Sequence, residues 1–191
     1  MEADTKEEVK EAIALIQASK FQEAVEVLEK ALESGPDDAE AWGLHSQALA
    51  SLKDYKGATD SIERSLSLGP GNALNWQLKG TYLLRLGRIY DAIKAIDESL
   101  RIRPTALTYV LRGQADYNQG KLDEAELYFQ IALTDEPENP LVNQMMGLTL
   151  FGKKRFADAV PYLDKALSYV KSEHLEKVLD ESRRRSEEIM G

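Results

Sequence analysis

The sequence predicts an all-α fold built from repeated pairs of helices. Three kinds of residue recur at steps of 33 or 34 positions along the 191-residue chain. The recurring residues are alanines at Ala24, Ala58, Ala92, Ala125 and Ala159, prolines at Pro36, Pro70, Pro104 and Pro137, and aromatics at Trp42, Trp76 and Tyr109. A repeat of this length is one supersecondary unit that buries its apolar face only by stacking on its neighbours. We therefore expect a stack of repeats.

Each repeat contains two helical stretches. In residues 39–72, the first half places apolar residues at helical rather than alternating spacing, and "KDYKG" interrupts it. The second half carries one apolar stripe and ends at "GPGN", because glycine suits the end of a helix and proline cannot continue one. The predicted organisation is one solenoid over residues 1–191, with repeats at 5–38, 39–72, 73–105, 106–139 and 140–171 and a capping helix at 173–190.

Small residues mark the expected contacts within each pair. First helices carry Ser46, Gly80, Gly113 and Gly147, and second helices carry the recurring alanine. Helices cross closely only where side chains are small, so these positions are expected to meet. In "YVLRGQADYNQG", Gly120 is expected to end the helix so that the next one can fold back.

Spacing, small residues, aromatics and terminal prolines together resemble the tetratricopeptide repeat. The resemblance is clearest in "NWQLKGTYLLRLGRIYDAIKAIDESLRIRP" and covers nearly the whole chain. It implies a right-handed superhelical solenoid whose first helices line a concave side. It also implies a noncatalytic scaffold or adaptor that binds other proteins.

The two ends of the chain depart from the repeat pattern. In the first repeat, Glu8 and Glu11 replace apolar residues, and we expect them to meet water because nothing stacks outside them. The last repeat lacks a terminal proline, and Ser172 is expected to cap the helix that follows. The apolar stripe of that helix predicts a cap over the last repeat; it consists of Leu175, Val178 and Leu179. Pro161 is expected to remove one hydrogen bond from its helix and to bend it.

Matching the repeat pattern assigns a peptide-binding groove to the first helices. The predicted groove residues are Val9, Ile13, Gln47, Leu74, Gln77, Thr81, Leu84, Arg85, Leu107, Val110, Gln114, Tyr117, Asn118, Leu141, Gln144, Leu148 and Phe151. Glu40 and Gly43 occupy matching positions in the second repeat. The groove is apolar and amide-rich rather than charged. Amides donate and accept hydrogen bonds, as a peptide backbone requires, and apolar patches suit alternate side chains or a helix face. The alternative is that the superhelix or the last helix buries this face.

The family's carboxylate clamp is not expected here. That clamp holds an acidic C-terminal tail of a chaperone with groove lysines and asparagines. The matching positions carry neither residue; they are Val9, Gly43, Gln77, Val110 and Gln144, then Ile13, Gln47, Thr81, Gln114 and Leu148. We predict that the chain does not bind an acidic chaperone tail in this way.

Composition and charge narrow the function further. A net charge of −9 argues against binding nucleic acid or an anionic membrane, and no segment predicts membrane insertion. The chain has no cysteine, and its acidic N-terminus does not resemble a signal peptide, so a cytoplasmic location is expected. His45 and His174 lie too far apart in the pattern for a metal site, His45 being expected to pack and His174 to be solvated. No catalytic constellation is recognised, and no enzyme activity, metal or cofactor is predicted.

Two charged features have structural interpretations. Arg112 and Asp116, four residues apart on one helix, are expected to pair. The run Arg183 to Arg185 lies among glutamates and is expected to be a solvated face. A second hypothesis for the whole chain uses these charges. The acidic first repeat of one copy would meet the arginine-bearing end of another, which would give a self-assembling scaffold, head to tail or dimeric.

Overall fold

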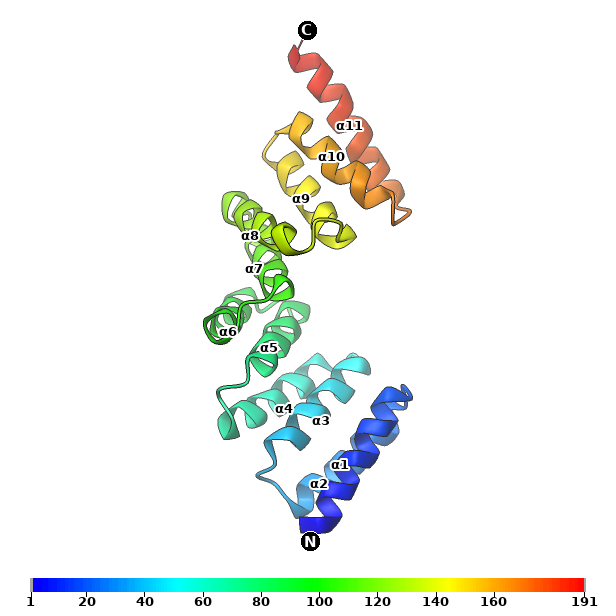
Figure 1. Cartoon of the computed structure of the whole chain (residues 1–191), viewed down its shortest axis with the longest axis vertical. Coiled ribbons are helices and arrows are strands. Elements are labelled where there is room, and N and C mark those ends of the chain that lie inside the picture. Colours follow the sequence, from blue (N-terminus) through cyan, green and yellow to red (C-terminus); the bar gives the residue numbers. More distant parts are fainter. Residues whose placement is uncertain (1, 191) are drawn as a thin grey trace. The chain divides into compact units, whose positions relative to one another are not determined.

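The structure, a computed structural model, is all-α over the residues that it describes. The backbone is described for residues 2–190 and the side chains for residues 5–189. The helices in this range are α1 (Glu2–Gln17), α2 (Phe21–Ser34), α3 (Ala39–Ser51), α4 (Tyr55–Leu68), α5 (Ala73–Arg85), α6 (Ile89–Ile102), α7 (Ala106–Asn118), α8 (Leu122–Asp135), α9 (Pro140–Gly152), α10 (Phe156–Leu167) and α11 (Glu173–Met190). The predicted five pairs and terminal helix are confirmed (Figure 1).

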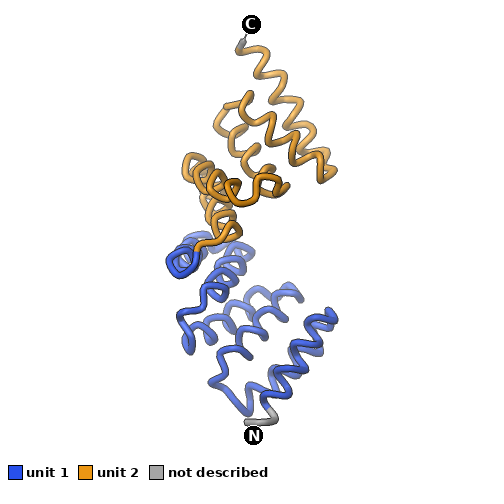
Figure 2. Tube along the Cα trace, viewed as in Figure 1, with its two compact units in different colours: residues 1–103 blue, residues 104–191 orange. Residues whose placement is uncertain are grey.

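The chain divides into two compact units between Arg103 and Pro104. Unit 1 comprises residues 1–103 and unit 2 residues 104–191 (Figure 2). The boundary lies just before the linker in which the repeat period loses one residue. Within each unit, every helix packs against the next one along the chain. That all five pairs form a single solenoid stays a prediction.

The first helices of the second to fifth pairs begin at a side-chain cap. Asp38, Asn72, Thr105 and Asn139 each accept a hydrogen bond from a backbone N–H in the first turn of the helix that follows. Such a cap satisfies N–H groups that have no partner inside the helix. Polar residues directly before the apolar stripe therefore fix where these helices start.

A left-handed residue reverses the chain within each pair. The residues with positive φ at these turns are Ser19, Lys53, Gly87, Gly120 and Lys154. Glycine adopts this conformation without steric strain, whereas in other residues the Cβ atom comes too close to the backbone carbonyl oxygen. Gly120, with a φ of 74°, therefore ends its helix as predicted.

The two helices of a pair cross at the recurring small residues. A Cβ atom on Gly113 would lie 2.7 Å from the Phe129 ring, and one on Gly147 would lie 2.7 Å from the Leu163 side chain. The recurring alanines of the second helices are fully buried. The glycines are therefore points of close contact, as predicted, but they face Phe129 and Leu163, four residues after the recurring alanines, rather than the alanines themselves.

The last helix covers the core of unit 2. Leu175, Val178 and Leu179 of α11 are buried against the cluster that contains Phe129 and Leu163. In Figure 1, α11 runs beside α10, and these two helices are in contact. Ser172 Oγ accepts a hydrogen bond from the Leu175 N–H at 3.4 Å. The predicted capping helix and its cap are thus confirmed, and α10 remains one helix through Pro161.

The first repeat corrects one expectation about its glutamates. Glu11 is exposed, as predicted. Glu8 is largely covered, with 14% of its side chain accessible, and its carboxylate pairs with Lys30 Nζ at 2.7 Å. The second helix of the pair supplies this partner, which sequence spacing alone did not reveal.

Candidate functional site

In unit 2, the first helices α7 and α9 present an apolar face with interspersed amides. Leu107 and Leu141, in their first turns, are each 51% exposed. Tyr117, Leu148 and Phe151 lie further along, are half-buried, and contact the core with part of their surface. Gln114 and Gln144 are half-buried and Asn118 is exposed. We call these eight residues the unit 2 face.

In unit 1, the first helices α1, α3 and α5 carry the remaining predicted groove residues. Leu74 and Arg85 are exposed, and the others are half-buried. We call this set the unit 1 face; it consists of Ile13, Gln47, Leu74, Gln77, Thr81, Leu84 and Arg85. The hydroxyl of Thr81 donates to the Gln77 carbonyl at 3.0 Å, so this hydrogen is already used.

Two predicted groove residues belong to the core instead. Val9 is 7% exposed and packs with Ala12 and Leu28, and Val110 is 4% exposed and packs with Phe129 and its neighbours. Their positions lie at the edge of the face, where the adjoining helices cover them. A partner in a groove therefore has no access to these two side chains.

The unit 1 face contains a cavity of about 440 Å³ between α3 and α5. We call it the α3–α5 cavity; its lining is Ala39, Glu40, Gly43, Leu44, Gln47, Gly69, Asn72, Leu74 and Asn75. Gly43 leaves it open, since a Cβ there would meet only ordinary contacts, at 3.5 Å and beyond. Four of the lining residues, Glu40, Gly43, Gln47 and Leu74, were expected in the groove.

Sequence reasoning missed Asn75. At the same position the second, fourth and fifth repeats carry Ala41, Thr108 and Val142, which are buried, whereas the first repeat carries Glu7, which is exposed. Asn75 is 7% exposed, and its side chain reaches Ser65 on α4. Asn75 carries an amide where these three repeats carry a smaller or apolar side chain, and this is the sequence feature that could have indicated a special role.

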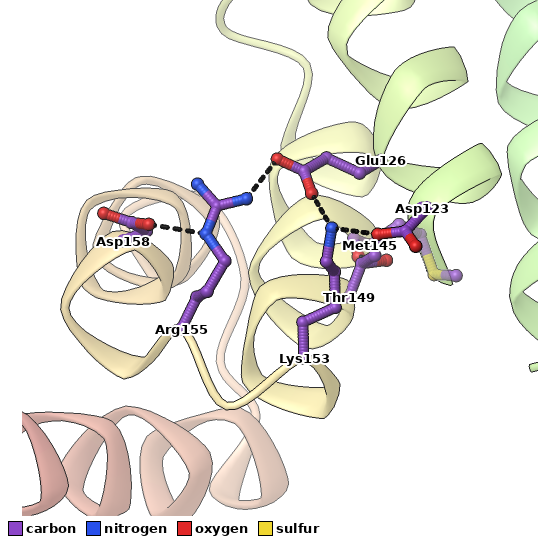
Figure 3. A network of polar contacts seen from close by, with 7 residues as sticks. All are labelled: Asp123, Glu126, Met145, Thr149, Lys153, Arg155 and Asp158. Carbon is purple, nitrogen blue, oxygen red and sulfur yellow. Dashed lines mark hydrogen bonds and ion pairs between the residues drawn. The ribbon is translucent and has the colours of Figure 1, made fainter. Parts of the chain in front are cut away.

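Charged side chains on other surfaces of unit 2 form ion pairs with one another. Glu126 of α8 binds Lys153 Nζ and Arg155 Nη1, each at 2.6 Å, and Lys153 also meets Asp123 (Figure 3). Burial raises the pKa of Glu126, but hydrogen bonds from Lys153 and Arg155 outweigh it and hold the pKa below its ordinary value. Asp158 accepts from Arg155 at 2.7 Å. These ion pairs connect α8 to the turn between α9 and α10.

The Arg112–Asp116 pair is confirmed as internal. The Arg112 guanidinium binds the Asp116 carboxylate, which is 1% exposed, and lies 5.0 Å from the centre of the Tyr128 ring. The arginines of α11 are also paired, Arg183 with Asp164, and Arg184 and Arg185 with Glu181.

The histidines lie in structural positions. His45 is 8% exposed, and its Nδ1 lies 2.9 Å from Ser61 Oγ, as expected for a packing residue. Burial lowers the pKa of His45, and Glu29 partly opposes this by raising it. His174 is exposed. Over the described part of the chain, no group of three His, Asp or Glu side chains could hold a metal ion.

The repeat family follows from the match to its model. The family model described as tetratricopeptide repeat matches residues 9–73, 77–140 and 110–173. The chain belongs to the tetratricopeptide repeat family. The resemblance read from the sequence is therefore confirmed, and proteins of this family generally mediate protein interactions or assembly. No curated protein sequence matches the chain.

Solved structures of other tetratricopeptide repeat proteins share the fold. PilW, a type IV pilus biogenesis factor, aligns with a TM-score of 0.81 at 22% identity, over 96% of this chain and 89% of PilW. MamA residues 41 to the end from Desulfovibrio magneticus RS-1 align with a TM-score of 0.81 at 22% identity, over 86% and 94%. YrrB, a tetratricopeptide repeat protein with an unusual peptide-binding site, aligns with a TM-score of 0.77 at 23% identity, over 92% and 90%. At these identities the likeness concerns the fold.

None of the helices in residues 2–190 combines the length and the apolar character needed to span a lipid bilayer.

Proposed function

We propose that the protein is a noncatalytic cytoplasmic adaptor that binds a peptide or helix of a partner protein along its first helices. The observation that carries the proposal is the unit 2 face. Leu107 and Leu141 each keep half of their surface accessible beside half-buried aromatics and amides. Large exposed apolar residues gathered with polar ones are typical of interaction sites.

The chemistry of the unit 2 face suits a peptide. Gln114 and Gln144 offer donors and acceptors to a backbone, whereas Leu148 and Phe151 offer apolar surface to side chains. The ring of Phe151 is held edge-on against Phe156, with centroids 5.4 Å apart, so it is positioned before a partner arrives. A preformed aromatic contact loses little entropy on binding.

The test replaces Leu107 and Leu141 with glutamate. The second repeat already carries Glu40 at this position, and an acidic residue is favourable in the first turn of a helix, so folding should be unaffected. Tyr117 and Phe151 are less suitable because they also contact the core. We expect the double variant Leu107→Glu, Leu141→Glu to lose partner binding by about tenfold or more, because two half-exposed apolar contacts are replaced by charges.

The measurement needs a defined partner and a matched control. Proteins that co-purify with the wild-type chain from its native cell are identified, synthesised as overlapping peptides, and titrated against each variant. The control is Leu127→Glu on α8, a leucine that is 58% exposed but outside the face. Equal affinity for the wild type and the Leu107, Leu141 variant, with unchanged helicity, would contradict the proposal.

Self-assembly has less support than partner binding. Head-to-tail contact between copies would need basic groups free to meet the acidic first repeat. Arg183, Arg184 and Arg185 instead each pair with a carboxylate of their own chain. We expect light scattering to give the mass of a monomer at low and at high salt, whereas a mass that grows as salt is removed would favour self-assembly.

A further inference from the structure

We propose that the α3–α5 cavity receives a basic side chain, lysine or arginine, of the partner. This inference rests on the proposed function and specifies part of what is bound. It depends on the orientation of one buried amide, on the caps that occupy N–H groups at the two helix starts beside the cavity, and on the charge around the cavity.

A short chain of hydrogen bonds fixes the Asn75 amide. The hydroxyl of Ser65 donates to the Ala39 carbonyl at 2.5 Å, so its hydrogen is used and its oxygen can only accept. Asn75 lies 2.8 Å from that oxygen and must therefore present its Nδ2 group to it. The Oδ1 atom is the other terminal atom of this amide, and it receives no hydrogen bond from a described residue.

Asn75 thus offers an acceptor to the cavity that it lines. The residue is 7% exposed, and no described residue donates to its Oδ1, so this oxygen is available to a donor of a ligand that enters the cavity. The cavity therefore favours ligands with N–H groups.

An anionic ligand fits this cavity poorly, although two helices begin beside it. Asp38 already accepts from the Glu40 and Ala41 N–H groups at the start of α3. Asn72 accepts from the Leu74 and Asn75 N–H groups at the start of α5. Two of the N–H groups that would otherwise attract an anion are therefore occupied at each helix start.

The charge around the cavity is negative. Glu40 is exposed on its lining and also borders a second hollow of about 620 Å³, which is lined by Asp37, Asp38 and Lys6 among others. Three carboxylates and one lysine surround the pair of hollows, within an N-terminal region that holds twelve acids and four bases in residues 1–40. This balance attracts a cation and repels an acidic peptide.

The walls of the cavity suit the stem of a long basic side chain. Leu44 and Leu74 are apolar and line the cavity together with Gly43. Lysine and arginine bury their methylene stems against apolar surface while the charged end remains hydrogen-bonded. A stem against the leucines, with the charged end near Asn75 Oδ1 and Glu40, satisfies both requirements.

The test uses four defined probes and the full chain labelled with ¹⁵N. The first is an acetylated, amidated peptide of alanine and leucine with a single central arginine, and the others carry lysine, norleucine or glutamate in its place. We expect the arginine peptide, and its lysine counterpart, to shift the NMR signals of Gly43 and of the Asn75 side-chain amide. The norleucine peptide should leave them unchanged.

Three variants localise the effect. Asn75→Ala copies the residue of the second repeat at this position, and should weaken the arginine peptide about tenfold because a bond to a charged donor is lost. Gly43→Gln copies the third and fifth repeats, fills the cavity, and should weaken binding similarly. Glu40→Gln should weaken it about threefold, as an exposed charge pair does, whereas Glu26→Gln on α2 should have no effect.

The outcomes distinguish this inference from the proposed function. Equal binding of the arginine and norleucine peptides, tighter binding of a glutamate peptide, or no saturable shift with any probe would each overturn the basic side-chain site. None of those results would affect the predicted loss of partner binding by the variant Leu107→Glu, Leu141→Glu. A partner bound equally by that variant would remove the proposed function even if the arginine peptide occupies the cavity.

Discussion

Helices α7 and α9 occupy equivalent places in consecutive repeats of unit 2, yet they fill one pair of positions with opposite chemistry. In α7 these are Arg112 and Asp116, which form an ion pair. In α9 the same positions hold Met146 and Leu150, each 1% exposed. The repeat therefore specifies the burial of these side chains and leaves their polarity free, provided that a buried charge has its partner.

The largest expected effect comes from breaking the pair in α7. Replacing Arg112 with methionine, the residue of α9, leaves the Asp116 carboxylate buried without its guanidinium. We expect the free energy of unfolding of the full chain to fall by about 3–5 kcal/mol, measured by urea denaturation at pH 7.

The double variant Arg112→Met, Asp116→Leu is the matched control, because it makes α7 identical to α9 at both positions. It should recover most of the loss, since an apolar pair of suitable volume can replace a buried ion pair at little or no cost. A double variant as unstable as Arg112→Met alone would show that the two positions are not equivalent.

A smaller effect is expected at the turns that follow these two helices. The turn after α7 has Gly120 at φ 74°, and the turn after α9 has Lys154 at φ 60°. Lysine pays a steric cost in this conformation that glycine avoids. Lys154→Gly should therefore raise the free energy of unfolding by about 0.5–1 kcal/mol. Gly120→Lys should lower it, and a gain there would refute the explanation.

The smallest effect concerns the ion pairs of Lys153, a position that is Gln119 in the preceding repeat. We compare Lys153→Gln with the wild type by urea denaturation across pH. Hydrogen bonding to Lys153 lowers the pKa of Asp123, and the pKa of Glu126 is also lowered. Their contribution is therefore present above their unfolded pKa, about 4, and is lost as the pH falls through the folded pKa.

At alkaline pH the sign is reversed for Lys153. Hydrogen bonds to Asp123 and Glu126 raise the pKa of Lys153, so its contribution is complete below its unfolded pKa, about 10.4, and is lost as the pH rises through the folded pKa. The difference in the free energy of unfolding between the wild type and Lys153→Gln should be constant near neutral pH and should decrease at acidic and at alkaline pH. Asp123 is 85% exposed, so salt should reduce the difference as well. A pH-independent difference would indicate lost packing.

Features that depend on nearby residues could be predicted from the sequence. The period of the alanines and glycines predicted the helix pairs, because close crossing needs small side chains at fixed intervals. The apolar stripe of residues 173–190 predicted the cap in the same way. Arg112 and Asp116 could be paired because four residues make one helical turn.

Features that depend on contacts between helices could not be predicted. Val9 and Val110 share their repeat position with Gly43, which lines the α3–α5 cavity, and only the packing of adjoining helices shows that the two valine side chains belong to the core. Asn75 looked like one member of a row that is buried in three other repeats, because nothing in its own helix indicates that Ser65 of α4 takes one side of its amide. The groove as a whole stays a prediction, since repeat position identifies a face but not its occupant.

The hydroxyl of Ser65 gives the α3–α5 cavity a direction that can be inverted. Repeats one, four and five carry alanine at this position, namely Ala31, Ala132 and Ala166. With alanine at 65, the Asn75 amide is free to rotate, and its Nδ2 group, rather than its oxygen, can face the cavity. The Ser65 Oγ atom, on a different helix, thus determines whether the cavity binds a hydrogen-bond donor or a hydrogen-bond acceptor of the ligand. A substitution of this serine, which is not among the lining residues, can therefore change the specificity of the cavity without changing a residue that lines it.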